Sequence, residues 1–512
     1  MPISQQGAIN TTALIVPDLY VQIVAPQVSL LNGVPTNVAG IVGTASWGPV
    51  NSPTTGANMT DYARQFGPLL ARKYDMGTMV AAAVLQGASN FRFVRVTDGT
   101  DTAASVVVQT NCITFTSKYT GSLGNQIGVQ LATGTQANTW KAIVSIPGRQ
   151  PESFDNIGAG LSGNALWVAI ASAINLGLSG LRGPSEIIVA TAGAGVTTPS
   201  AASFTLSGGT DGVTSITSAT LLGADTYPRS GMYALRNQGV SIAALADCDD
   251  STSWATQIAF ALAEGIYIML VGPAGDTISG AVAAKATAGI DSYAAKLLFG
   301  DWVYFNDTVN GQIRLISPQG YALGRLANLS PQESSLNKQL WGIVGTQKSK
   351  SGLTYSSAEL QSLAQAGIDV IANPVPGGNY FGVRIGHNAS SDAVTQGDNY
   401  SRMTAYIAAT INAGMGLYVG QIQNPKAQRN AKATLNAFFQ ALFDQEMIGS
   451  SDGSIPWQVI LDGTNNPQSR VALGYMQADV KVIYLSIIEK FLINIEGGQS
   501  VQIVRQSTQS NT

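Results

Sequence analysis

Between residues 230 and 375, apolar runs rich in β-branched residues alternate with segments in which small and apolar residues recur at helical spacing. The predicted strands are Val240–Ala246, Ile266–Val271 and Ala295–Phe305, and the predicted helices are Trp254–Ala263, Gly280–Ala288 and Gly320–Leu326. Such alternation is typical of βαβ units, which place parallel strands in one sheet and cover its faces with helices. The pattern predicts an α/β body over residues 213–375.

The chain has 512 residues, more than one hydrophobic core covers, so we expect several domains. Residues 103–212 are poor in charge and rich in Thr, Ser and Gly, which predicts a β-rich domain inserted into the α/β body. Residues 376–496 predict an α+β C-terminal domain. Its predicted helices are Tyr400–Ile411 and Ala427–Phe443, and its predicted strands are Trp457–Leu461, Val471–Met476, Val480–Ile488 and Phe491–Glu496.

The predicted architecture is therefore multidomain α/β with an extended arm at each end. The expected units are an N-terminal arm (1–26), a first α/β segment (27–102), the inserted domain (103–212), the α/β body (213–375), the C-terminal domain (376–496) and a C-terminal arm (497–512).

The single histidine of the chain, His387, limits the chemistry that it can perform. A metal site with two or three histidines cannot be built within one chain, and two cysteines, Cys112 and Cys248, cannot form a Cys₄ site. A lone histidine in a polar loop is more often a surface or hydrogen-bonding group than a catalytic base. We expect no catalytic residue, metal or cofactor.

Three carboxylates, Asp247, Asp249 and Asp250, follow a predicted strand and precede the predicted helix Trp254–Ala263. Carboxylates before a helix favour its dipole, so helix capping is the preferred interpretation. Binding of a cation at the end of the strand is the less favoured alternative.

Charged residues make up 11% of the chain, against about 25% in a typical soluble protein. The formal net charge of −3 offers no basic face, so we expect no nucleic-acid partner. The longest apolar stretch, Ile258–Val271, contains Glu264 and is too short to span a bilayer, and residues 1–10 do not resemble a signal peptide. We therefore expect a soluble, non-secreted protein whose weakly charged surface favours contact with copies of itself.

Three basic residues, Lys426, Arg429 and Lys432, are spaced three apart at the start of a predicted helix and therefore share one face. They form either a solvated face or a short basic stripe directed at an acidic partner.

Each end of the chain carries a strand-forming segment that Pro or Gly-Gly separates from the neighbouring domain. The residues are Tyr20, Val21, Ile23 and Val24 near the start and Val501, Ile503 and Val504 near the end, with Gly497 and Gly498 as the predicted hinge. An unpaired strand can add to the sheet edge of another chain, and at about 1 kcal/mol per hydrogen bond five residues contribute several kcal/mol. The alternative is that both strands complete a sheet of their own chain.

Several motifs, in order along nearly the whole chain, resemble the sheath proteins of contractile phage tails. The segment Pro17–Ile23 is similar to the family's "PGVYV" start, with Asp18 where glycine is usual, and Val38–Pro49 resembles its first-domain signature. Further similarities lie at Gly121–Ile127, Leu206–Gly212, Gly367–Ala372, Gly382–Arg384 (with Phe381 for Trp and Ile385 for Thr), Asp462–Asn466 and Gly474.

The resemblance implies a structural subunit of a virion tail, a late protein assembled in the cytoplasm of a bacterial host. Its partners would be copies of itself in stacked hexameric rings, the tail tube, the baseplate and the tail terminator, and contraction would drive the tube through the host envelope. The resemblance also implies a subtilisin-like fold for residues 230–375, arms that add strands to neighbouring subunits, and a tube-facing position for Lys426, Arg429 and Lys432.

Two other functions remain open at this point. An α/β hydrolase of subtilisin-like fold would need His387 beside a serine and an acid. A non-contractile self-assembling shell protein would share the low charge and the self-association, but would need no tube.

Overall fold

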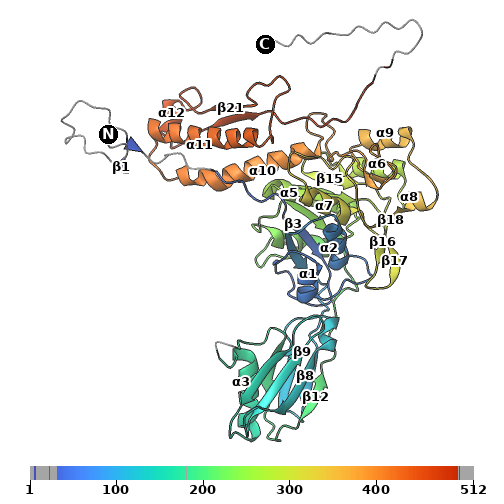
Figure 1. Ribbon diagram of the computed structural model, residues 1–512, viewed down its shortest axis with the longest axis vertical. Coiled ribbons are helices and arrows are strands. Elements are labelled where there is room, and N and C mark those ends of the chain that lie inside the picture. The colour runs from blue at the N-terminus through green and yellow to red at the C-terminus, as the bar shows by residue number, and fades with distance from the viewer. Residues whose placement is uncertain (1–4, 7–21, 24–30, 180–181, 494, 496–512) are drawn as a thin grey trace, which may run out of the picture.

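The computed structural model describes residues 5–6, 22–23, 31–179, 182–493 and 495 of the chain. These residues form a mixed α/β multidomain molecule in which three regions follow one another along the long axis (Figure 1). The inserted β-rich domain lies at one end, the α/β body lies in the middle, and the C-terminal domain with its two long helices lies at the other end.

A six-stranded sheet forms the centre of the α/β body, in the order β15-β14-β13-β3-β5-β4. All neighbours are parallel except the β4–β5 pair. The strands are β3 (Ala39–Gly43), β4 (Thr54–Gly56), β5 (Phe91–Arg95), β13 (Ile242–Leu245), β14 (Tyr267–Val271) and β15 (Ala295–Leu298). Strand β3 precedes the inserted domain in the sequence and β13 follows it. Because these two strands pair, the chain before and after the inserted domain forms one sheet.

Helices cover both faces of this sheet. Residues of α2 (Met76–Leu85) and α7 (Gln319–Asn328) pack on one face, and residues of α5 (Trp254–Glu264), α6 (Ile278–Ala288) and α9 (Ser357–Gln365) pack on the other. The α2–α7 contact is close enough that a Cβ atom on Gly324 would lie 2.4 Å from Cα of Ala83. The remaining helices of this part are α1 (Met59–Phe66), α4 (Ser218–Leu222) and α8 (Gln347–Lys350).

The predicted strand Ala295–Phe305 is wrong, because the chain leaves the sheet after Leu298. It turns at Gly300, where a Cβ atom would lie 2.0 Å from the carbonyl oxygen of Pro273, so only glycine fits. It then enters a separate antiparallel sheet of order β17-β16-β18. The strands are β16 (Val303–Asp307), β17 (Gln312–Ile316) and β18 (Ile343–Thr346), and a two-stranded pair β19 (Ile371–Ala372) and β20 (Gly382–Val383) follows.

The described residues of the inserted domain form two antiparallel sheets, of order β10-β9-β8-β12 and β11-β7-β6, and one α-helix, α3 (Gly163–Leu176). Buried residues of the helix and of both sheets form a core of their own. The strands are β6 (Ser105–Val108), β7 (Ile113–Ser117), β8 (Gly128–Thr133), β9 (Trp140–Ser145), β10 (Glu152–Ile157), β11 (Ile188–Ala192) and β12 (Ala202–Thr205).

The C-terminal domain begins with α10 (Asp398–Met415) and α11 (Pro425–Asp444), both longer than predicted. The predicted strand Val471–Met476 is wrong, because the chain there forms the short helix α12 (Gln468–Val471) and turns. Of the predicted strand Val480–Ile488, only Asp479–Val482 pairs as β22, with β21 (Trp457–Ile460). Residues 491–493 and 495 are not in a strand, contrary to prediction. Within the described ranges, no helix is long and apolar enough to cross a membrane.

Candidate interaction surfaces of the C-terminal domain

Helices α10 and α11 are built around a shared apolar stripe. Asn424 caps α11 by accepting a hydrogen bond from the backbone N–H of Ala427, and Pro425 occupies the first helical position, where no N–H is needed. The stripe and the inner side of β21 form one core, made of Met403, Ile407, Leu435, Phe438, Phe439, Leu442, Ile448 and Val459. This packing fixes the two helices and the small sheet as one scaffold, on which the exposed residues of the domain are displayed.

A fully buried ionic network fastens the first turn of α10 to the α/β body. The Lys296 ammonium on β15 lies 2.5 Å from Oδ2 of Asp369 and 3.1 Å from Oδ1 of Asp398, and all three side chains are 0% exposed. Tyr267 on β14 also donates a hydrogen bond to Asp398, at 2.6 Å. Burial acts to raise the pKa of Asp398, but the Lys296 charge and the hydrogen bonds of Ser335 and Tyr267 hold that pKa below its usual value.

Sequence analysis did not single out Lys296, Asp369 or Asp398. One local signal was present, because Lys296 interrupts the apolar run 294–299, and a lysine in a buried strand needs a partner. Its partners lie 73 and 102 residues away, and no spacing rule connects them.

His387 is a hydrogen-bonding group, one of the two roles expected for it, and it is buried, with 9% exposure. Its Nε2 atom lies 2.9 Å from Oε1 of Glu489 in the C-terminal segment. A carboxylate only accepts, so Nε2 carries the proton and donates it. In the described part of the chain no serine bonds to the ring, and Nδ1 has no partner, so the arrangement that a hydrolase needs is not formed.

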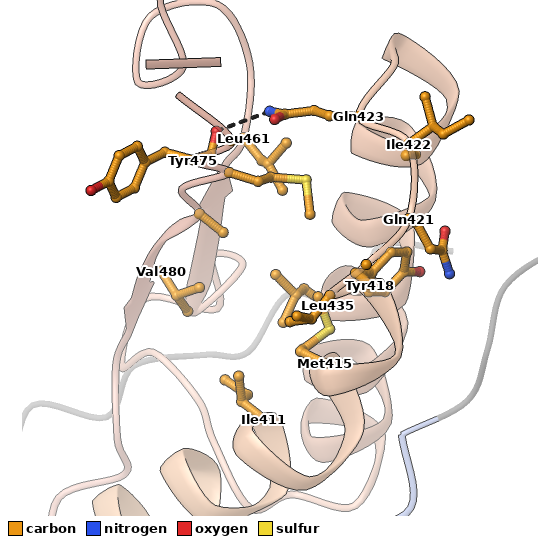
Figure 2. A pocket seen from close by; sticks show the side chains of 16 residues that line it. Ile411, Met415, Tyr418, Gln421, Ile422, Gln423, Leu435, Leu461, Tyr475 and Val480 are labelled. Atoms are coloured by element: carbon orange, nitrogen blue, oxygen red, sulfur yellow. Dashed lines mark hydrogen bonds between the residues drawn. The ribbon is translucent and has the colours of Figure 1, made fainter. Parts of the chain in front are cut away.

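An open apolar groove of about 500 Å³ lies where α10 ends (Figure 2). Ile411 and Met415 of α10, Leu435 of α11 and Val480 of β22 project into it. Its rim carries Val419 and Ile422, which are 85% and 83% exposed. The side chain of Gln423 closes one corner by donating a hydrogen bond to the carbonyl oxygen of Tyr475 at 3.0 Å. Sequence analysis missed this groove, because it forms between α10 and β22, which are far apart in the sequence.

The basic stripe lies on the first half of α11. Lys426 and Arg429 are exposed and Lys432 is half-buried, and among the described residues none of the three makes an ion pair. Hydrogen bonds from Thr464 and, less strongly, the charge of Lys432 lower the pKa of Asp462. The stripe is thus available to a partner at its Lys426 end.

The small sheet β21–β22 has no third strand within the part of the chain that is described. The carbonyl oxygen of Ile460, at the end of β21, accepts a hydrogen bond from the side chain of Asn465. The predicted arm residues Tyr20, Val21, Val24, Val501, Ile503 and Val504 and the predicted hinge residues Gly497 and Gly498 lie outside the described residues. Ile23 lies in β2 (Gln22–Ile23), which pairs in parallel with β1 (Gln5–Gln6).

The three carboxylates after β13 have separate roles. Asp250 caps the short 3₁₀ turn before α5 by accepting a hydrogen bond from the N–H of Thr252, as the capping interpretation predicts. Asp249 pairs with Lys73 at 2.9 Å, and Asp247 is buried and accepts a hydrogen bond from the N–H of Tyr74. Among the described residues, no group of three or more His, Cys, Asp or Glu side chains could hold a metal ion.

Solved structures with a similar fold were found by comparison with the whole chain. The structure matches the sheath tail protein of Listeria innocua with a TM-score of 0.60 and 14% identity, over 85% of this chain and 90% of that one. It matches the sheath tail protein of Desulfitobacterium hafniense with a TM-score of 0.58 and 17% identity, over 87% and 94% of the two chains. The chain has the fold of tail sheath proteins.

The sheath fold extends to contractile injection systems. The contracted sheath of the extracellular injection system PVC matches with a TM-score of 0.54 and 10% identity, over 94% of this chain and 99% of that one. No protein-family model and no curated protein matches the sequence. The similarity therefore lies in the fold.

Proposed function

We propose that this protein is the sheath subunit of a contractile tail. In this role it polymerises as stacked hexameric rings around a tail tube, and contraction of the polymer drives the tube through the envelope of a host cell. The observation that carries the proposal is the fold match, which extends over 85–94% of the chain and includes all three regions of the molecule. The role is mechanical, and no enzymatic step is part of it.

The outer edges of the β21–β22 sheet support the linkage between subunits. Strands donated by the N- and C-terminal arms of neighbouring subunits would pair with the N–H and C=O groups of these edges. Such links hold the rings together while the bodies rotate, because an arm can bend at the predicted hinge Gly497–Gly498 without leaving the sheet.

The basic stripe Lys426, Arg429 and Lys432 supports a contact with an acidic tube surface. Its exposed end makes no internal ion pair among the described residues, so contact with an acidic partner would displace no ion pair of the chain itself. The α/β body, for which we propose the subtilisin-like description, serves in this role as a spacer. Baseplate and terminator proteins would bind the two ends of the polymer in a virion tail assembled in the bacterial cytoplasm.

Electron microscopy of the purified full-length chain, alone and with its tube protein, tests the proposal. We expect helical polymers with six-fold rings, and their length should follow the tube when the tube is present. Flat or closed shells whose size and shape do not change when the tube protein is added would contradict the sheath function. They would support the alternative, a non-contractile shell protein. A chain that stays monomeric under both conditions would contradict both assembly functions.

A further inference from the structure

Two apolar surfaces of this chain remain uncovered by its own described residues. The first is the groove at the end of α10 (Figure 2). Its rim residues Val419 and Ile422 are almost fully exposed. The second is the run Phe491, Leu492 and Ile493, with exposed fractions of 81%, 84% and 62%. Exposed apolar patches of this kind mark contact sites in soluble proteins.

The chain path carries the apolar run away from the groove. Strand β22 starts beside the groove, where Val480 lines it, and the following residues run back along α10 toward its first turn. There the side chain of Asn399 donates a hydrogen bond to the carbonyl oxygen of Leu485 at 3.0 Å. Four residues later, Glu489 accepts the hydrogen bond of His387.

This clasp between Glu489 and His387 limits where the run can go. From Asn399, the nearest groove residue of α10, Ile411, is twelve residues away, or about 18 Å along the helix axis. Ile493 follows Glu489 by four residues and can reach at most about 13 Å, and Phe491 can reach about 7 Å. While Glu489 is fastened, the backbone of the run therefore stops short of Ile411.

We propose that the groove receives the apolar run Phe491–Ile493 of a second copy of this chain, and that the Glu489–His387 clasp keeps the chain's own run out. The inference rests on the proposed sheath function and names the residues of one contact in it. Because the groove and the run lie on different parts of the surface, the contact is heterologous, with the run of each copy entering the groove of the next. Heterologous contacts produce rings or helical polymers, whereas a self-complementary patch would produce a closed dimer.

Single cysteines placed on the two surfaces test the contact between copies. Ile422→Cys on the groove rim and Phe491→Cys on the run are made in separate chains, which are mixed under mild oxidation. The natural Cys112 and Cys248 are buried and remain in place. We expect a mixed disulfide dimer to form at least ten times faster than in a mixture of Phe491→Cys with Val309→Cys, an exposed position of the α/β body.

The clasp is tested by placing both cysteines in one chain and diluting it until contacts between chains are rare. Glu489→Ala should raise the yield of the disulfide within the chain at least five-fold, whereas Lys490→Ala, at the exposed neighbouring position, should leave it unchanged. An equal yield in both variants would overturn the role of the clasp. If either cysteine variant melts below wild type, Val419→Cys with Leu492→Cys provides a second pair.

Failure of the contact can be distinguished from failure of the sheath function. Polymers in the microscope without the mixed disulfide would overturn the groove contact and leave the sheath proposal standing. A mixed disulfide without polymers would support the contact and contradict the sheath proposal.

Discussion

The Nζ atom of Lys296 lies 3.1 Å from Oδ1 of Asp398, which joins the central sheet of the α/β body to the first residue of α10. One turn further along α10, the Arg402 guanidinium donates hydrogen bonds to the carbonyl oxygens of Leu329 and Ser330. Every charge at this joint is buried and has a partner. We infer that these contacts hold the body and the first turns of α10 together as one rigid unit.

Replacing Lys296 by Met should destabilise the α/β body strongly. The change leaves two buried carboxylates without their cation, which costs about 3–5 kcal/mol. Differential scanning calorimetry should show the transition of the body lowered by roughly 6–20 °C. The matched substitution Lys350→Met, at an exposed lysine without an ion pair, should change the transition by less than about 2 °C. Equal shifts in the two variants would show that the network does not stabilise the fold.

The stability of the body should depend on pH through two buried carboxyl groups. Burial raises the pKa of Asp75 and of Asp247 to about 6, and the charge of Asp75 adds to the rise at Asp247. Because the folded state holds these protons more tightly, their stabilising contribution is complete below about pH 4 and is lost as the pH rises through about 6. Each contribution is on the order of 1–3 kcal/mol.

Asp247→Asn mimics the protonated carboxyl group and should remove part of this dependence. We expect the melting temperature of the variant relative to wild type to be higher at pH 7.5 than at pH 5. Asp250→Asn is the control, because its hydrogen bonds, first of all that of Ser218, lower the pKa of Asp250; this group stays ionised from pH 5 to pH 7.5, so the difference between this variant and wild type should not change over that range. A difference between Asp247→Asn and wild type that does not change with pH would contradict this assignment.

The sequence predicted the elements whose signal is local and long. Helix α11 follows an Asn-Pro start and keeps an apolar stripe for twenty residues, so its type was not in doubt. The run Ala295–Phe305 was predicted as one strand because its apolar character continues through a turn. That turn requires close contact between the backbones of Gly300 and Pro273, which the sequence pattern does not show. Short apolar runs such as Val471–Met476 do not distinguish helix from strand by period alone.

The sites were less predictable than the elements. The basic stripe could be placed on one helix face, because its three residues share that helix. The partners of Lys296 and of His387 come from segments about 70–100 residues away, and they are brought together by the packing of the α/β body and the C-terminal domain. No pattern within one segment carries that information, and the groove near Ile411 was missed for the same reason.

Trp47 should prove to be the joint between the body and the inserted domain. It follows β3 in the body, yet its ring is fully buried in the core of the inserted domain, where Nε1 donates a hydrogen bond to Ser117 at 2.9 Å. Trp47→Ala should cost about 3–5 kcal/mol and speed hydrogen exchange in β7, next to the joint. Trp47→Phe keeps the ring contact with Tyr119 and should cost less. Unchanged exchange in the Ala variant would contradict the role of Trp47.

Reversing the charge of the basic stripe should weaken assembly on the tube. The triple variant Lys426→Glu, Arg429→Glu and Lys432→Glu should lengthen the lag of tube-templated polymerisation at least ten-fold, and the wild-type lag should lengthen with added salt, because the stripe is exposed to solvent. The control reverses three exposed cations outside the C-terminal domain, Arg64, Lys118 and Lys350. If the two triple variants assemble alike, the stripe is a solvated face and the tube contact lies elsewhere.

Removing residues 499–512 should abolish polymers without unfolding the chain. The truncation deletes the predicted strand that contains Val501, Ile503 and Val504, whose addition to a neighbouring sheet contributes several kcal/mol per contact. We expect no sheath-length polymers in sedimentation and at most short oligomers, because the truncated chain keeps the run Phe491–Ile493, and its melting temperature should equal that of the full-length protein. Removing residues 507–512 alone spares the predicted strand and should leave polymer formation intact. Sheaths of normal length from the longer truncation would show that the C-terminal arm does not link the subunits.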